Sequence, residues 1–385
     1  MTKKHILWQF ILLSYLGLFS FGLIDNSRGP VYPEILQGFN VLPSKGSWIF
    51  SLSSLAGLVT TLSGNLWLRS FSTIYSLRIF LLFQAMGAFG IGFSAIYGFS
   101  FPLLLLASFI LGLSSGGIGI CTNIMISQSV PKRLRRKTYA GLHAMYGIAS
   151  LFAPIFLSIT SRSDIDWKHH FYLVAFIPLC IFILSFFLNI KKDKHCLKVI
   201  TQKIKFTNVY KICLIFSLYV ASEIIVSSRL VYYLEETYKW DKTSASLYLS
   251  IFFFLLLFGR LSFSMISFPG KSYNWLKASL IISLVLFVVG LFIHPIALAV
   301  LGLSQSFFFP CAMDWLYEKH GKLADSIMPL VMTIMAITLI CMHWAVGLIA
   351  SFSNIHHAMF LGPVFAVISL CLLFTERPHL PDKKL

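Results

Sequence analysis

Long apolar segments follow one another along nearly the whole chain. Each is close to the ~20 residues that a helix needs to cross the ~30 Å hydrocarbon core of a bilayer. Little of the chain is left over, so we expect an all-α membrane protein without a sizeable soluble domain. The pattern predicts twelve transmembrane helices, at about 6–36, 45–68, 74–98, 101–128, 138–160, 169–190, 208–234, 243–267, 274–293, 295–317, 326–350 and 357–374.

The composition favours the same fold class. Hydrophobic residues make up 57% of the 385-residue chain and charged residues 12%, whereas soluble domains carry roughly 45–50% apolar and about 25% charged residues. A bilayer can cover this apolar surface, because lipid tails are themselves apolar. The apolar run that follows the basic start is long and lacks a small-residue cleavage site. We therefore expect an uncleaved first helix rather than a signal peptide.

The positive charge is divided unequally between alternate loops. The formal net charge of +17 would by itself also suit a nucleic-acid-binding protein. However, 23 basic residues fall in loops on one side of the predicted membrane, and five fall on the other side, namely Lys45, Arg162, Lys168, Lys239 and Lys242. The positive-inside rule makes the first side cytoplasmic. We therefore expect both termini in the cytoplasm, a location in the bacterial inner membrane, and no nucleic-acid partner.

The two halves of the chain share one plan. A basic linker at 191–207 separates an N-terminal six-helix half at 1–190 from a C-terminal six-helix half at 208–385. Short motifs recur at matching places: Ser27-Arg28 corresponds to Ser228-Arg229, and Leu111-Gly112-Leu113-Ser114 corresponds to Leu301-Gly302-Leu303-Ser304. Two such repeats predict a solute site between the halves, which rock to expose it to either side.

Ionisable residues inside the predicted spans are functional candidates, because a charge in the bilayer is costly unless it is paired or hydrated. Glu223 lies twelve residues past Lys211, which places it ~18 Å along its helix, near the midplane. A carboxyl group at this depth is suited to take and release a proton. We assign proton coupling to Glu223 and also to Asp25. The alternative for Glu223 is a hydrogen bond that locks two helices together.

The predicted solute-binding residues are Asp25, Arg28, Asn123 and Arg229. Asp25 and Arg28 are three residues apart and share a helical face. They either neutralise each other or present opposite charges to a solute. Arg28 and Arg229 correspond in the two repeats, and two arginines facing one cleft would suit a carboxylate or a phosphate. Alternatively, each arginine reaches toward the membrane interface.

Other ionisable residues in or near the spans receive gating or structural roles. Arg260 is expected to brace the inner end of its span against a neighbouring carbonyl or acid. Asp314 is either part of an inner gate or an interfacial residue. His143 either makes a helix-packing hydrogen bond or titrates near neutral pH. Glu34 and Glu235 are expected to be exposed to solvent at the outer mouth.

Several motifs resemble those of the major facilitator superfamily, and within it the fucose permease-like branch. They are Phe21-Gly22 with Gly29-Pro30, His143-Ala144-Met145-Tyr146-Gly147, and Gly259-Arg260-Leu261. The resemblance extends over the whole length of the chain. It implies the major facilitator fold, with twelve helices in two six-helix pseudo-repeats, and transport by alternating access.

The chain departs from the resembled family at functional positions. The family's loop between spans two and three has Gly, three residues, then Asp-Arg, whereas Gly64 here is followed by Leu68-Arg69. Arg69 therefore lacks the neighbouring acid, and we assign it a gating or structural role. In the fucose permease-like branch, acids that couple transport to protons lie where this chain has Gly29 and Gly119. Proton coupling in this chain would need another group.

The motifs of zinc proteases and nucleotide-driven pumps are missing from the sequence. It contains no HExxH and no complete GxxxxGK[ST] phosphate loop. We predict a secondary transporter without enzymatic activity, cofactor or metal, acting as a monomer. Its expected activity is uptake of a small polar organic solute by proton symport. The alternatives are a proton-driven exporter of amphipathic compounds and a transport-incompetent receptor on the same scaffold.

Overall fold

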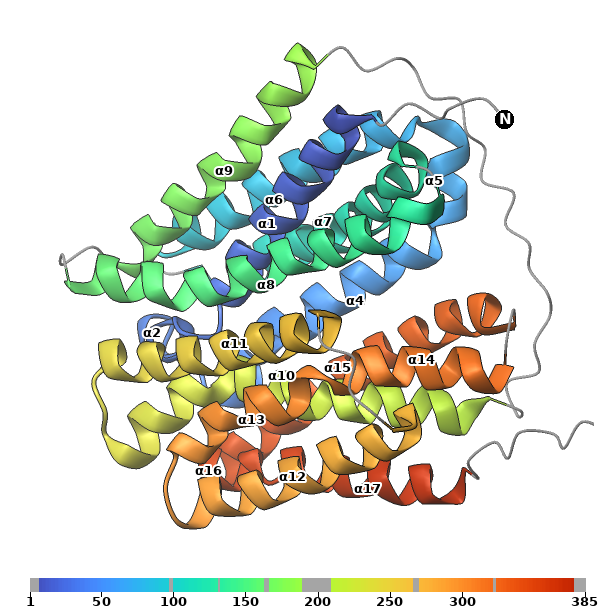
Figure 1. Cartoon of the computed structure of the whole chain (residues 1–385). Coiled ribbons are helices and arrows are strands. Elements are labelled where there is room, and N and C mark those ends of the chain that lie inside the picture. Colours follow the sequence, from blue (N-terminus) through green and yellow to red (C-terminus); the bar gives the residue numbers. More distant parts are fainter. Residues whose placement is uncertain are drawn as a thin grey trace, which may run out of the picture.

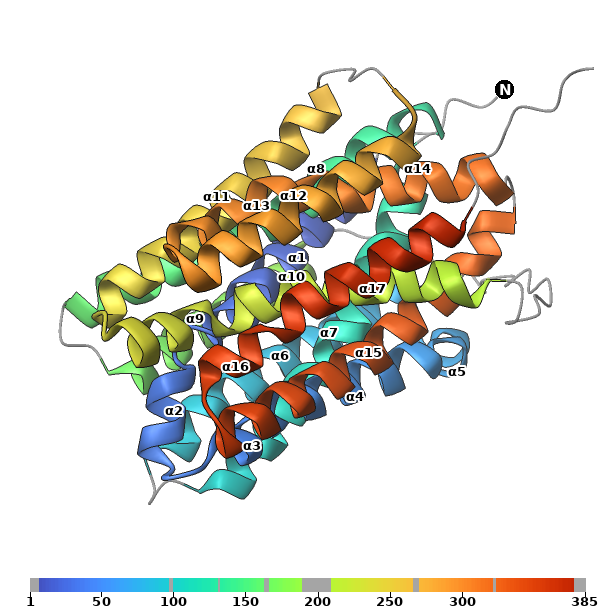
Figure 2. The same cartoon turned by 90° about the horizontal axis from the view of Figure 1, so that it is seen from below.

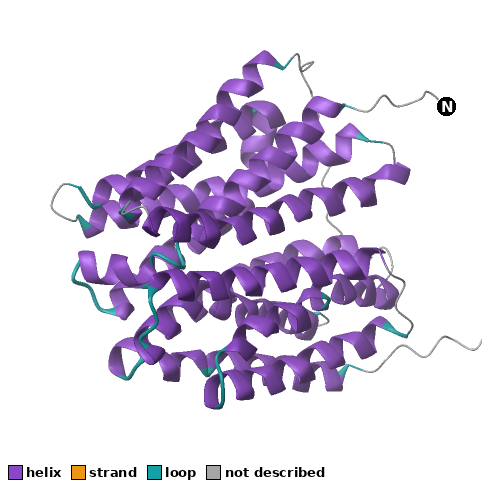
Figure 3. Ribbon diagram, turned by 60° about the vertical axis from the view of Figure 1, so that its left-hand side comes forward, coloured by secondary structure: helices purple, strands orange, loops and turns teal. Residues whose placement is uncertain are grey.

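The computed structural model describes residues 7–96, 100–130, 132–162, 166–188, 209–265, 270–320 and 323–376. In this part of the chain the backbone forms helices joined by turns and contains no strand (Figure 3). The predicted linker at 191–207 lies outside the described residues. Eleven described stretches are long and apolar enough to cross a membrane. The chain is thus an integral, multi-pass membrane protein with an all-α fold.

The helices of the N-terminal half are α1 (Trp8–Ser27), α2 (Tyr32–Gly38), α3 (Pro43–Gly46), α4 (Trp48–Leu62), α5 (Gly64–Ser70), α6 (Thr73–Ser94), α7 (Phe101–Ser129), α8 (Lys132–Arg162) and α9 (Trp167–Phe187). The helices of the C-terminal half are α10 (Tyr210–Tyr238), α11 (Lys242–Met265), α12 (Ser272–Phe292), α13 (Ile296–Ser306), α14 (Phe308–His320), α15 (Ala324–Phe352), α16 (Ile355–Met359) and α17 (Leu361–Thr375).

Four predicted spans are interrupted helices, and one of them, the twelfth, divides at Phe360 into α16 and α17. The first ends at Ser27 instead of continuing to position 36, because Gly29 and Pro30 follow and Pro30 has no backbone N–H to donate. The second consists of α4, which has 15 residues, and α5, so neither piece alone has the length of a span. The tenth divides at Phe307 into α13 and α14, three residues before Pro310. Counted as one span, α4 and α5 bring the eleven long stretches to the predicted twelve.

The long helices run side by side in two groups. Figure 1 shows α1 and α6–α9 on one side of the molecule and α10–α17 on the other, with α4 between them. Figure 2, seen from below, shows α4 beside α15. Two helix pairs carry most of the packing between the groups: α4 against α15, and α8 against α11. These pairs are equivalent under the predicted repeat, since they join spans two and eleven, and spans five and eight.

The repeated glycines occupy equivalent places in the two halves. A Cβ atom on Gly112 of α7 would lie 2.1 Å from the backbone oxygen of Ser53 on α4. A Cβ atom on Gly302 of α13 would lie 2.1 Å from the backbone oxygen of Phe252 on α11. Only glycine permits these backbones to approach so closely. The sequence match between the two motifs therefore corresponds to the same helix contact in each half.

Candidate solute-binding and coupling site

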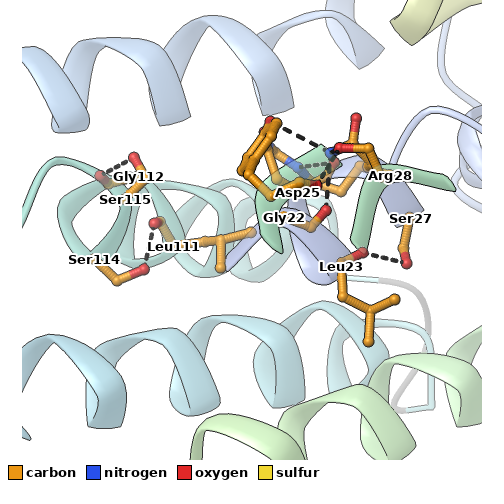
Figure 4. A network of polar contacts seen from close by, with 12 residues as sticks. Gly22, Leu23, Asp25, Ser27, Arg28, Leu111, Gly112, Ser114 and Ser115 are labelled. Carbon is orange, nitrogen blue, oxygen red and sulfur yellow. Dashed lines mark hydrogen bonds and ion pairs between the residues drawn. The ribbon is translucent and has the colours of Figure 1, made fainter. Parts of the chain in front are cut away.

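Asp25 and Arg28 form an ion pair at the end of α1 (Figure 4). The three-residue spacing places both side chains on one face of the helix. The Tyr146 hydroxyl of α8 donates a hydrogen bond to Asp25 Oδ2 at 3.0 Å. Asn26 donates to Ser150 Oγ of the same helix at 2.9 Å. The two charges therefore neutralise each other in this conformation, while α8 fixes the orientation of the carboxylate.

Arg229 of α10 is enclosed by aromatic rings from the other half of the chain. Its guanidinium carbon lies 4.3 Å from the ring centre of Tyr32 and 4.1 Å from that of Phe50. The Ser47 hydroxyl accepts a hydrogen bond from Arg229 Nη2 at 3.3 Å. Arg229 is 1% exposed and Arg28 is 7% exposed. Both arginines are therefore buried where the halves meet.

Glu223 of α10 is part of a polar cluster rather than an isolated acid. Arg260 of α11 forms an ion pair with Glu223 Oε1 at 3.1 Å. The Tyr219 hydroxyl has one proton and two acceptors within reach, Glu223 Oε2 at 2.7 Å and the backbone oxygen of Gln305. The Tyr219 ring stacks on Phe308 with a centroid distance of 3.7 Å. This arrangement joins α10, α11, α13 and α14 around one carboxylate.

The other predicted solute-binding residue, Asn123, is engaged within its own helix. Its amide donates to the backbone oxygen of Gly119 at 2.7 Å. A Cβ atom on Gly119 would meet nothing within 4 Å, so this position of α7 faces open space. His143 of α8 is exposed. These residues do not contact the clusters around Arg229 and Glu223 through any described hydrogen bond.

Of the remaining predicted gating residues, Asp314 makes its hydrogen bond outside both clusters. Asp314 of α14 is exposed and accepts a hydrogen bond from the Ser272 hydroxyl at the start of α12. Arg69 belongs to the short helix α5, and its side chain lies outside the described part of the chain. The structure thus groups Asp25, Arg28 and Arg229 at one level and Glu223 with Arg260 at another.

Polar contacts between the halves gather at the end of the bundle that the charge pattern predicts to be extracellular. Glu34 of α2 forms an ion pair with Lys242 at the start of α11. The backbone N–H of Ser44 donates to Ser351 Oγ at 2.6 Å. The expectation that Glu34 is exposed to solvent was therefore wrong, because its side chain is only 27% exposed and is paired with Lys242.

Asp241 adds negative charge beside Lys242. It lies in the turn between α10 and α11, and its carboxylate accepts a hydrogen bond from the Ser244 N–H at 3.0 Å. Hydrogen bonds from Ser244 hold the pKa of Asp241 below its ordinary value, because they favour the ionised form. The turn therefore stays anionic at neutral pH and caps the first turn of α11.

The sequence did not single out the aromatic residues that surround the two arginines. Tyr32 and Phe50 contact Arg229, and His343 of α15 stacks on Phe50 with a centroid distance of 5.0 Å. The chain has 37 Phe and 15 Tyr residues, so no local signal distinguishes these two. Only the packing of α2, α4, α10 and α15 reveals them.

The sequence of the chain matches one family model over most of its length. The Major Facilitator Superfamily model aligns with residues 14–338. The chain belongs to the Major Facilitator Superfamily. Members of this family are transporters rather than enzymes.

Curated relatives of this Major Facilitator Superfamily chain align over less than half of its length. The uncharacterized MFS-type transporter YfiU of Bacillus subtilis is 28% identical over 48% of this chain and 34% of its own length. The efflux pump roqT of Penicillium rubens is 32% identical over 41% of this chain and 28% of its own length. The aligned regions thus span about a third of these relatives.

Solved structures share the fold over nearly the whole chain. A D-xylose-proton symporter has a TM-score of 0.78 at 13% identity and covers 99% of this chain and 100% of its own. The Escherichia coli fucose:proton symporter FucP has a TM-score of 0.63 at 15% identity and covers 96% of this chain and 98% of its own. At these identities the likeness shows the fold alone, and the fucose permease-like branch stays a prediction.

Proposed function

We propose that this chain is a proton-coupled secondary transporter that takes up a small polar organic solute by alternating access. The two rocking units would be the six-helix halves at 1–190 and 208–385, joined by the linker at 191–207. The chain would lie in a bacterial inner membrane with both termini in the cytoplasm, as the loop charges predict. The sugar–proton symporters that share its fold support proton symport as the mode of transport.

The observation that carries this proposal is the position of the contacts between the halves. The ion pair of Glu34 with Lys242 and the hydrogen bond of Ser44 with Ser351 lie at the predicted outer end. The backbone of Gly29 approaches Ser227 at the same end, where an added Cβ would lie 3.1 Å from the Ser227 oxygen. Such contacts would keep the outer side closed, and separating them would admit a solute from outside.

Glu223 is our proposed proton carrier. Arg260 neutralises its charge in this conformation, so a proton and Arg260 compete for the same carboxylate. Protonation of Glu223 would release Arg260, and release of the proton would restore the ion pair. This exchange would link proton movement to the packing of α10 against α11. Asp25 is the second candidate, and its pairing with Arg28 would give it the same kind of switch.

Transport into liposomes tests the proposal. Purified chain would be reconstituted, a proton gradient imposed, and a panel of radiolabelled sugars, amino acids and organic acids offered. We expect gradient-dependent accumulation of at least one solute, abolished by a protonophore. Glu223→Gln imitates the protonated form and should abolish accumulation while preserving exchange of solute. Failure of the parental chain to accumulate any member of a broad panel would contradict the proposal.

A matched substitution controls for the loss of any carboxylate from α10. Glu236 lies on the same helix, is 53% exposed and, among the described residues, forms an ion pair with Lys239 alone, at 3.6 Å. Glu236→Gln should therefore accumulate solute at the parental level. Parental accumulation by Glu223→Gln would make Glu223 a structural residue, and Asp25 would become the next candidate.

Export is the second candidate function. It is favoured by the sequence similarity to roqT, which is named as an efflux pump. In the same liposomes an exporter would move amphipathic compounds out of the cytoplasmic face against their gradient. Accumulation of a polar solute through the opposite face would instead favour uptake.

A further inference from the structure

The ring of Phe50 lies at the centre of a cluster of basic side chains. Arg229 lies 4.1 Å from its centroid and Arg28 lies 5.4 Å from it, while the His343 imidazole stacks on it at an interplanar angle of 22°. Arg28 follows α1, Phe50 belongs to α4, Arg229 to α10 and His343 to α15. The cluster is therefore built from both halves and lies where they meet.

The charges of this cluster do not cancel. Asp25 neutralises Arg28, but no carboxylate of the described residues forms an ion pair with Arg229. The hydrogen-bond acceptors of Arg229 are the Ser47 hydroxyl and the backbone oxygen of Ser228, at 3.3 Å and 3.2 Å. Burying a cation without a counter-ion costs free energy that hydroxyl and carbonyl dipoles offset only in part. The cluster thus keeps one uncompensated positive charge.

Buried polar atoms without a hydrogen-bond partner among the described residues lie around this charge. Arg28 Nη1 and Arg229 Nε are buried and have no hydrogen-bond partner, and the same is true of His343 Nδ1. Arg229 is 1% exposed and His343 is 4% exposed, so bulk water does not satisfy these atoms. An acceptor for the two arginine atoms would have to lie beside Phe50, and His343 would donate to it in the tautomer that carries its proton on Nδ1.

We propose that the transported solute carries a carboxylate, and that Arg229 and Arg28 bind it beside Phe50. This inference rests on the proposed function, since it names the class of solute. A single negative charge balances the cluster, and guanidinium groups present paired donors that match the two oxygens of a carboxylate. The rings of Tyr32 and Phe50 supply an apolar wall for the organic part of the same molecule.

The position of Arg229 links anion binding to closure of the transporter. Its enclosing groups, Tyr32, Ser47 and Phe50, belong to the N-terminal half, whereas Arg229 belongs to the C-terminal half. Separation of the halves at this end would return Arg229 to water, and closure buries it. A bound carboxylate supplies the counter-ion that makes this burial favourable. The anion would therefore promote closure over itself.

Thermal unfolding of the purified full-length chain tests the charge balance without knowledge of the solute. Arg229→Met removes an uncompensated buried cation, so it should raise the Tm in the absence of ligand. The matched control is Arg260→Met, which leaves Glu223 without its partner and should lower the Tm. A Tm for Arg229→Met below the parental value would overturn the inference, because it would show that Arg229 is compensated within the protein.

Probe binding tests the ligand class. Sodium benzoate should raise the Tm of the parental chain by several degrees, whereas benzamide, which has the same ring without a charge, should not. Arg229→Met should lose the response to benzoate, and Lys239→Met, which removes a cation that is 77% exposed at the end of α10, should keep it. Equal responses to benzoate and benzamide, or a response to inorganic phosphate but not benzoate, would overturn the assignment of a carboxylate. So would a full response in Arg229→Met.

The outcomes separate this inference from the proposed function. If the liposomes accumulate only uncharged solutes, the transport proposal stands and the inference of a carboxylate solute is rejected. A benzoate response without transport of any solute would keep the anion site and contradict the transport proposal.

Discussion

Replacing Gly112 or Gly302 with alanine tests whether the same helix contact stabilises each of the two halves. In each case the new Cβ would lie 2.1 Å from a backbone oxygen, whereas ordinary contacts of a Cβ begin near 3.4 Å. The atom in the way belongs to the backbone of α4 or α11 and cannot rotate aside. Each helix pair would have to separate by about 1 Å, because overpacked contacts are relieved by backbone shifts.

The expected cost follows from two opposing effects. Overpacking of this kind costs about 1–3 kcal/mol, and a clash with backbone belongs at the upper end of this range. Alanine in a helix gains about 1 kcal/mol over glycine. The net loss of stability is therefore about 2 kcal/mol for either variant. Gly119→Ala on α7 is the matched control. Its Cβ would meet nothing within 4 Å, so this variant has only the gain in helix stability.

Thermal unfolding in detergent, followed by tryptophan fluorescence, measures the difference. Gly112→Ala and Gly302→Ala should both melt several degrees below the parental chain, and Gly119→Ala should melt at or above it. The reasoning would be refuted if Gly112→Ala unfolded at the same temperature as Gly119→Ala. If only one of these two variants lost stability, the repeated sequence motif would not contribute equally to the stability of the two halves.

The remaining predictions concern topology and gating. Reporter fusions at Lys194 and at Leu385 should both report a cytoplasmic location, because the basic loops fall on that side; a periplasmic signal from either fusion would reject the orientation. Cysteines at positions 44 and 351, where the Ser44 N–H lies 2.6 Å from Ser351 Oγ, should form a disulfide that stops transport, and reduction should restore it. Undiminished transport by the cross-linked chain would show that this end does not need to open.

Much of the architecture could be predicted from hydrophobic pattern alone. The spans are long apolar runs, and a bilayer forces such runs into helices whose backbone groups bond internally. The breaks were harder to predict. Gly29 and Pro30 follow the end of α1, and the chain turns there before α2 begins. Pro154, by contrast, lies inside α8 without ending it. Whether a proline ends a helix depends on what neighbouring helices supply.

The candidate site was less accessible from sequence. The pairing of Asp25 with Arg28 is local and follows from spacing along one helix. The partner of Glu223 is Arg260, on the next helix, and nothing in the sequence indicates which faces of α10 and α11 meet. Tyr32 and Phe50 were harder still to predict, because their role depends on a contact with Arg229, which belongs to the other half. Contacts between the halves arise from tertiary packing, and the hydrophobic pattern of the sequence does not predict them.

Arg229 and the groups that enclose it lie far apart in the sequence, so they enter the membrane at different stages of synthesis. Asp25 and Arg28 enter together on α1, which therefore brings its own counter-charge into the bilayer. In α10, Glu223 and Arg229 are six residues apart, and their partners lie on α11, α2 and α4. Synthesis from the N-terminus places α2 and α4 in the membrane before α10 arrives. The first half would thus act as a template for insertion of the second.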